Sequence, residues 1–247
     1  MHNRKTRAYH GGNGGEPLLS VSGLQAWYGD SHVLHGIDFA VGAGEVVSLL
    51  GRNGAGKTTT LKAIMGMLER REGSVRVGSV ESIKLPSWQI ARLGVGYVPE
   101  ERGIYASLSV EENLLLPPEV KPGGLNKDQI LAMFPNLKER MTSQGTTLSG
   151  GEQQMLAIAR VLRTGARLLL MDEPAEGLAP VIIEQIGNTV KRLKHDGFAV
   201  VLVEQNFRFA STVADRHYFM EQGRVIDIIR NDELNQNMDK LHSYLGV

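Results

Sequence analysis

The sequence predicts an α/β fold with a mostly parallel core sheet, and three observations support that prediction. Short apolar runs such as VVSLL and LLLM recur along the chain, as in strands buried on both faces of a sheet. Segments with apolar residues at helical spacing lie between these runs. The pattern GRNGAGKT at Gly51–Thr58 joins one such run to one such segment, which is the context that a phosphate-binding loop requires.

The first elements after the N-terminal segment are predicted to be strands. LLSVSGLQAWYG and HVLHGIDFAV are interpreted as an antiparallel pair, and EVVSLLG as a buried strand that leads into the loop. Residues 1–17 are polar, rich in glycine and without periodicity. They are predicted to be a disordered tail, and residues 18–247 the folded domain.

The middle of the chain is predicted to be more helical. A helix from Lys57 to about Leu68 is followed by a strand at GSVRVG, a short helix at SWQIARLG and a strand at VGYVP. Glu111 to Met141 contains a proline-rich loop and the short helical pieces DQILAMF and NLKER. These features predict a helical subdomain of about residues 100–160 inserted in the core.

The last elements predicted alternate between helix and strand. A helix follows LSGGEQQM, ARLLLMDEP gives a buried strand, and FAVVLVEQ gives another. Between these two strands lies a helix whose apolar face carries Ile182, Ile186, Val190 and Leu193. Such alternation predicts a ligand at the carboxyl ends of the parallel strands.

Composition excludes several classes of partner and site. The 27 basic and 27 acidic residues balance, so no overall field attracts nucleic acid or an anionic membrane, and no nucleic acid is expected as a partner. The absence of cysteine excludes disulfides and thiolate metal sites. No apolar run approaches the length of a membrane span, and the N-terminus lacks the apolar segment of a secretory signal.

GRNGAGKT fits the phosphate-loop pattern at every fixed position. Its glycines let backbone N–H groups surround phosphates, Lys57 neutralises their charge, and Thr58 offers an oxygen to magnesium. The predicted nucleotide-binding residues of this segment are Gly51, Arg52, Asn53, Gly54, Ala55, Gly56, Lys57, Thr58 and Thr59.

LLLMDEP supplies two carboxylates at the end of a buried strand. Asp172 is predicted to hold the magnesium shell, and Glu173 to take a proton from an attacking water. A solvated acidic turn is the alternative, which the presence of the phosphate loop makes unfavourable.

LSGGEQQM suggests a second anion site. Ser149 can cap the helix, and Gly150 and Gly151 let an anion approach the positive end of the helix dipole. For SGG alone, an ordinary serine-capped helix is the favoured interpretation, and the other motifs make it unfavourable.

Together, the three motifs resemble the ATP-binding subunit of an ABC transporter over Leu18–Val247. The resemblance implies a P-loop NTPase of ABC type, with an antiparallel β subdomain and a helical subdomain, that hydrolyses ATP with Mg²⁺. It also implies that two cassettes pair. The segment that closes over the γ-phosphate held by the partner cassette is then Ser149, Gly150, Gly151 and Glu152.

Further roles are implied by position in the same family. Tyr28 stands where an aromatic ring stacks on adenine, and Glu176–Pro180 where a loop crosses the dimer interface. Two positions depart from the usual wording: Glu100 replaces a magnesium-contacting glutamine, and Gln205 replaces a histidine that faces the γ-phosphate. Gln205 can donate a hydrogen bond but, unlike histidine, cannot carry a proton. We therefore hypothesise that this chain hydrolyses ATP more slowly than its relatives, or under a different control.

YVPEERGIYASLSVEENL, DEPAEGLAP, LVEQN and the closing YLGV resemble one of the two unequal ATPases of branched-chain amino acid importers. That resemblance implies a second ATPase subunit, two permease subunits and, indirectly, a solute-binding protein, at the cytoplasmic face of the inner membrane. The permease contact is expected near Arg102–Leu108, with Tyr105 as an anchor. Three alternatives stay open: an importer of amides or urea, a soluble ABC ATPase of DNA repair or translation, and a cassette that binds ATP without turnover.

Overall fold

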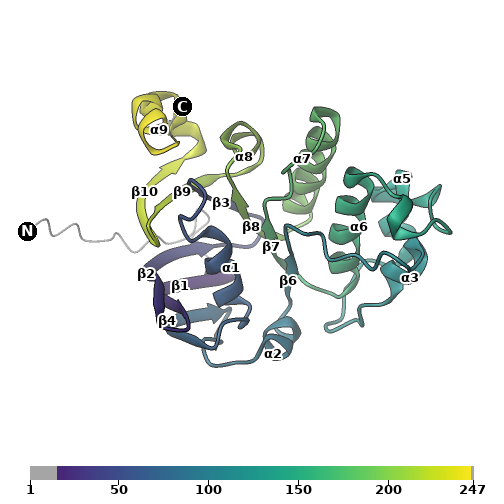
Figure 1. Ribbon diagram of the computed structural model, residues 1–247, viewed down its shortest axis with the longest axis horizontal. Helices are drawn as coiled ribbons and strands as arrows, with labels where there is room; N and C mark the ends of the chain where they lie inside the picture. The colour runs from purple at the N-terminus through teal and green to yellow at the C-terminus, as the bar shows by residue number, and fades with distance from the viewer. Residues whose placement is uncertain (1–15, 246–247) are drawn as a thin grey trace, which may run out of the picture.

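The computed structural model describes residues 16–245 and contains a six-stranded sheet at its centre (Figure 1). The strand order is β10-β9-β3-β8-β7-β6, in which β9, β3, β8, β7 and β6 run parallel and β10 pairs antiparallel with β9. The strands are β3 (Val46–Leu50), β6 (Val95–Val98), β7 (Leu168–Asp172), β8 (Ala199–Glu204), β9 (Arg216–Glu221) and β10 (Arg224–Arg230). The predicted parallel core sheet is confirmed.

A second, four-stranded sheet is antiparallel and has the order β2-β1-β4-β5. Its strands are β1 (Leu19–Tyr28), β2 (Ser31–Val41), β4 (Arg70–Val77) and β5 (Val80–Glu81). The predicted antiparallel pairing of the first two strands is confirmed. The strand predicted at GSVRVG begins three residues earlier, at Arg70.

Helices follow most strands of the core sheet. They are α1 (Lys57–Ile64), α2 (Ser87–Arg92), α3 (Val110–Leu115), α4 (Lys127–Met133), α5 (Pro135–Lys138), α6 (Gly150–Arg163), α7 (Pro180–His195), α8 (Phe207–Val213) and α9 (Met238–Leu245), with short 3-10 helices at Gly145–Thr147 and Asn231–Asn237. Helices α3, α4 and α5 pack against α6, to the side of β6 and β7 (Figure 1). Within residues 16–245, no helix has the length and apolar composition needed to cross a bilayer.

The prediction that the helix after the phosphate loop reaches Leu68 is wrong. Helix α1 ends at Ile64, and Gly66 adopts a left-handed conformation with φ of 70°. A Cβ at this glycine would lie 2.8 Å from the carbonyl oxygen of Leu85. The chain therefore turns away from the helix axis two residues after the helix ends. Residues 1–15 of the predicted tail lie outside the described residues.

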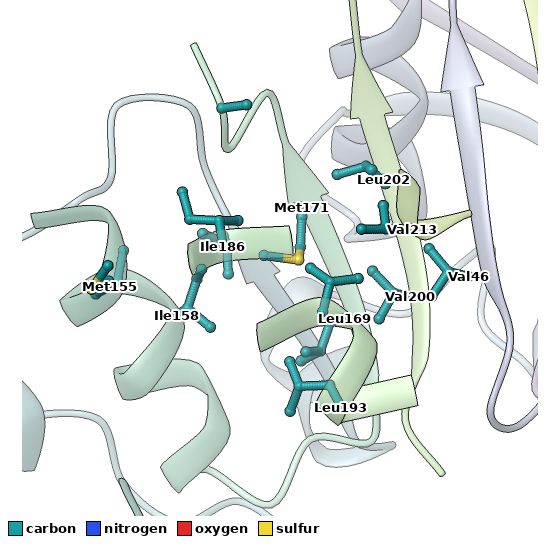
Figure 2. Close-up of a cluster of buried hydrophobic side chains, with 14 of the residues drawn as sticks. Val46, Met155, Ile158, Leu169, Met171, Ile186, Leu193, Val200, Leu202 and Val213 are labelled. Carbon is teal, nitrogen blue, oxygen red and sulfur yellow. The ribbon is translucent and has the colours of Figure 1, made fainter. Parts of the chain in front are cut away.

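Both faces of the core sheet are buried, which explains why β3, β7 and β8 are almost entirely apolar. On one face, alternate residues of β3, β7 and β8 pack against α6, α7 and α8 (Figure 2). On the other face, the intervening residues of the same strands pack against α1 and the antiparallel sheet. The strands are thus fixed from both sides, and their carboxyl ends hold the loops described next.

Candidate nucleotide site

The phosphate loop connects β3 to α1, as predicted. At two positions of this loop, only glycine fits the space that the neighbouring residues leave. A Cβ at Gly51 would lie 2.4 Å from the carbonyl oxygen of Met220, and one at Gly56 would lie 2.9 Å from a methyl carbon of Leu34. Gly56 also has φ of 99°, which strains any other residue. The close packing of the chain around the loop fixes its backbone before any ligand binds.

Lys57 is the central cation of this loop and is 4 % exposed. Its ammonium donates to the carbonyl oxygens of Gly51, at 2.9 Å, and Arg52, at 3.3 Å. It also forms an ion pair at 3.2 Å with Oε1 of Glu173, whose side chain is 11 % exposed. The structure therefore brings the predicted phosphate-binding lysine and the predicted base together.

Asp172 ends β7 and is 1 % exposed. Its Oδ1 accepts a hydrogen bond of 2.9 Å from the Thr58 hydroxyl, and its Oδ2 accepts one of 3.0 Å from the Tyr97 hydroxyl. Burial raises the pKa of Asp172, the two hydrogen bonds lower it, and the charges of Glu100 and Glu173 raise it further. The predicted magnesium residues Thr58 and Asp172 are thus in direct contact.

These oxygens fit a magnesium ion, because a hydroxyl and a carboxylate are ligands that Mg²⁺ takes beside phosphate oxygens and water. A bound divalent cation would also compensate the negative charge that crowds Asp172. Within residues 16–245, no group of three His, Asp or Glu side chains converges as a metal site. Side chains alone would therefore not complete the metal's ligand shell, and oxygens of the nucleotide would be needed as well.

Glu173 begins the loop after β7 in a left-handed conformation, with φ of 44°. Its backbone N–H donates to the Val203 carbonyl oxygen at 2.9 Å, which ties this loop to β8. Such a conformation is uncommon for a residue other than glycine and is a feature of functional sites. The backbone thereby aims the Glu173 side chain back at Lys57.

The segment at the start of α6 forms a capping box. The Ser149 hydroxyl accepts from the Glu152 N–H at 3.3 Å, and the Glu152 carboxylate accepts from the Ser149 N–H at 2.7 Å. The predicted serine cap is confirmed. Gly151 has a packing reason as well, because its Cβ would lie 2.7 Å from Ile182 on α7. In Figure 1, β6 and β7 are drawn between α6 and α1, so the two predicted anion-binding segments belong to different parts of the fold.

Comparison with known proteins assigns the family. A family model described as ABC transporter matches residues 34–176, which is more than half of the chain. The chain belongs to the ABC transporter family. It is therefore a nucleotide-binding ATPase, and the resemblance stated from the motifs is confirmed.

Individual relatives cover nearly all of this ABC ATPase. It is 41 % identical to the high-affinity branched-chain amino acid transport ATP-binding protein BraG of Pseudomonas aeruginosa, over 93 % of this chain and 100 % of BraG. It is 35 % identical to the probable branched-chain amino acid transport ATP-binding protein LivF of Archaeoglobus fulgidus, over 84 % and 90 % of the two chains. A solved ATP-binding subunit of an ABC transporter matches with a TM-score of 0.79 at 29 % identity, over 93 % of this chain and 100 % of that one.

Three further predicted residues of the ABC ATPase are exposed. Tyr28 ends β1 and is 47 % exposed, and its ring is free to stack on a base. Glu100 follows β6 and Gln205 follows β8. Because β6, β7, β8 and β3 are parallel neighbours, the loops that carry Glu100, Glu173, Gln205 and Lys57 leave the same edge of the sheet.

The sequence analysis missed Tyr97 and Glu204 at this edge, and it placed Glu176 only in a loop at the dimer interface. Tyr97 donates to Asp172, and burial together with the Asp172 charge raises the pKa of its phenol. Glu176 lies close enough to Glu173 and Glu100 that burial and their charges raise its pKa. Glu204 is buried at the end of β8. The apolar pattern of a strand gives no sign of its polar last residue, but LVEQ places an acid where the parallel strands end.

Proposed function

We propose that this ATPase powers an importer of branched-chain amino acids, bound to its membrane subunits at the cytoplasmic face of the inner membrane. The observation that carries the proposal is the similarity to BraG, which extends over nearly the whole of both chains. LivF, whose name gives the same class of cargo, supports it. The cargo itself does not contact an ATPase, so the chemistry of the site supports only the hydrolysis.

Glu173 is proposed as the general base for hydrolysis. Its carboxylate lies within 3.2 Å of the Lys57 ammonium, and therefore next to the place where the phosphate loop would hold a γ-phosphate. In this position it can accept the proton of a water that attacks the phosphorus atom. Lys57 and the loop N–H groups would stabilise the charge that develops on the phosphoryl oxygens.

Thr58 and Asp172 are proposed to hold Mg²⁺, with Glu100 as a further oxygen ligand. A metal held by these residues would neutralise part of the charge of the phosphate groups. The contact between Thr58 and Asp172 at 2.9 Å keeps both oxygens oriented toward the same point. Tyr97 fixes the second oxygen of Asp172.

A second ATPase subunit is proposed to complete each site, because the start of α6 and the phosphate loop lie in different parts of one chain. The N–H groups of Ser149–Glu152 would then meet the γ-phosphate bound by the partner. Gln205 is proposed to donate a hydrogen bond to the γ-phosphate held by the phosphate loop of its own chain, and Tyr28 to stack on adenine.

The permease contact is proposed at a groove of about 270 Å³ beside Pro99, Gly103, Pro117 and Arg160. Tyr105 stands near this groove and is 51 % exposed, with the Arg160 guanidinium over its ring at 5.3 Å. Asn113 holds the loop, since it accepts from the Tyr105 N–H and donates to the Tyr105 carbonyl oxygen. An exposed aromatic ring on a braced loop is suited to docking a helix of another subunit.

The experiment is uptake in cells that lack the gene for this chain. Uptake of labelled leucine, isoleucine and valine should fall and should be restored by the wild-type gene but not by Lys57→Ala, which loses the phosphate contact. Labelled urea serves as the comparison solute. Unchanged uptake of all three amino acids in the deletion strain would disprove the proposed cargo.

A further inference from the structure

Glu204 is a buried carboxylate to which the proposed reaction gives no role. It is the last residue of β8 and is 2 % exposed, whereas the next residue, Gln205, is exposed. Acidic side chains are rarely buried so completely unless a partner compensates them. The groups that form hydrogen bonds with Glu204 therefore indicate its role.

The two oxygens of Glu204 hold two different loops. Oε1 accepts a hydrogen bond of 3.1 Å from the N–H of Ala175, and Oε2 accepts one of 3.3 Å from the N–H of Asn206. Ala175 is two residues after Glu173, and Asn206 is next to Gln205. One side chain thus joins the loop of the proposed base to the loop of the proposed γ-phosphate contact.

This link needs a carboxylate. An ionised carboxylate accepts hydrogen bonds at both oxygens, whereas a glutamine of the same shape has one acceptor and would direct its NH₂ group at the second N–H. Burial raises the pKa of Glu204 to about 7, the N–H groups of Ala175, Asn206 and Gln205 lower it, and the Glu173 charge raises it. The fold keeps an ionisable group here although burial disfavours its charge.

We propose that Glu204 is a positioning residue that holds Glu173 and Gln205 in a fixed relation to each other. The inference rests on the proposed function, because it requires that both residues act on the γ-phosphate. Glu204 acts through the backbone, together with the hydrogen bond from the Glu173 N–H to the Val203 carbonyl oxygen. The loops after β7 and β8 then approach the nucleotide as one unit.

The test is Glu204→Gln in the full chain, purified with its membrane subunits. The side chain keeps its shape and is neutral, so the fold should be retained. The kcat of ATP hydrolysis should fall roughly tenfold to a hundredfold, because small misplacement of reacting groups is costly, while KM for ATP should change by less than about twofold. Lys57, Thr58 and Tyr28 make no hydrogen bond to Glu204 among those found in residues 16–245.

Asp38→Asn is the matched control. The Asp38 carboxylate also accepts a backbone hydrogen bond, of 2.8 Å from the Gly23 N–H, but it joins β1 to β2 in the antiparallel sheet. Its replacement should leave kcat unchanged. An equal loss of kcat in both variants would show that any lost carboxylate contact slows the enzyme and would contradict the proposal.

A double variant separates positioning from general structural damage. If Glu204 acts through Glu173, adding Glu204→Gln to Glu173→Gln should slow hydrolysis much less than it slows the wild type, since the two changes share the contribution of Glu173. Independent, multiplying losses would overturn the inference, as would an unchanged kcat in Glu204→Gln when Glu173→Gln is slow. Undiminished hydrolysis in Glu173→Gln would instead overturn the assignment of the base, and the positioning role with it.

Discussion

Glu173 combines an uncommon backbone conformation with an ion pair inside the phosphate loop. The strain of a left-handed glutamate is small compared with the free energy of folding, but it is retained only where surrounding contacts fix it. Here the Val203 carbonyl oxygen and Lys57 are those contacts. The residue is therefore held in place from both its backbone and its side chain.

Replacing Glu173 with glutamine should lower ATP turnover by on the order of a hundredfold or more, because the amide cannot accept a proton. Nucleotide binding should remain, since the phosphate loop is unchanged. A steady-state hydrolysis assay and a fluorescent-nucleotide titration measure the two effects.

Glu184→Gln on the exposed face of α7 is the control and should leave turnover unchanged. Wild-type turnover in Glu173→Gln would remove Glu173 as the base.

The start of helix α6 has the features typical of a helix N-terminus. These are a serine cap, a glutamate at the third position and an apolar face. The Arg140 guanidinium contributes a further hydrogen bond to Glu152, at 3.1 Å. The first turn is therefore rigid, and its N–H groups keep one direction.

Ser149→Arg should spare nucleotide binding by the isolated chain but prevent pairing with the second ATPase subunit. Arginine removes the cap, at a cost of about 1 kcal/mol, and places a long cation at the positive end of the helix. Nucleotide titration and size-exclusion chromatography of the mixed subunits measure the two properties.

Asn126→Arg removes a capping box of the same kind from α4, so it controls for the loss of stability and should still pair. Normal hydrolysis by the assembled Ser149→Arg complex would show that α6 does not contact the partner's nucleotide.

The sequence predicts some elements better than others for identifiable reasons. Strands β3, β7 and β8 are almost entirely apolar, because both faces are buried, and they were predicted from that pattern. Strand β9 was not predicted, since Arg216 and His217 give it a polar start. Both are buried in the fold, where Glu45 pairs with Arg216 at 2.8 Å and Ser48 hydrogen-bonds His217 at 2.7 Å. Such partners come from distant segments of the chain, so the local pattern of polar and apolar residues cannot reveal them.

The residues of the candidate site also differ in how well the sequence predicts them. Residues inside a motif, such as Lys57 and Asp172, could be predicted because the motif fixes their neighbours. Tyr97 and Glu204 could not, because their role depends on which strand lies beside which. Only the sheet order shows that Tyr97 meets the last residue of β7 and that Glu204 meets the loop after β7.

The whole molecule carries buried ionisable groups whose effects on stability oppose each other. The folded pKa of Glu204, about 7, lies above its ordinary value of 4.5. Its protonated form is therefore favoured by folding, so its contribution to stability is complete below pH 4.5 and is lost as pH rises through 7. Burial lowers the pKa of His217, and this contribution has the opposite sign, because it is present above pH 6.5 and lost on acidification.

Glu204→Gln should isolate the first contribution. Relative to the wild type, the variant should gain stability as pH rises from 5 to 8, because it has no buried carboxyl to ionise. Urea unfolding of both chains at pH 5, 6, 7 and 8 gives the difference at each pH, from which the His217 contribution cancels. A difference that is constant over this range would contradict the raised pKa of Glu204.

The ion pair between Lys57 and Glu173 also orders events. One ammonium cannot give its full attraction to a carboxylate and a triphosphate at once, so an arriving nucleotide must weaken the contact at 3.2 Å. The nucleotide would then release the proposed base that acts on it. The ion pair would serve as an interlock, because the proposed proton acceptor stays bound to Lys57 until phosphate groups displace it.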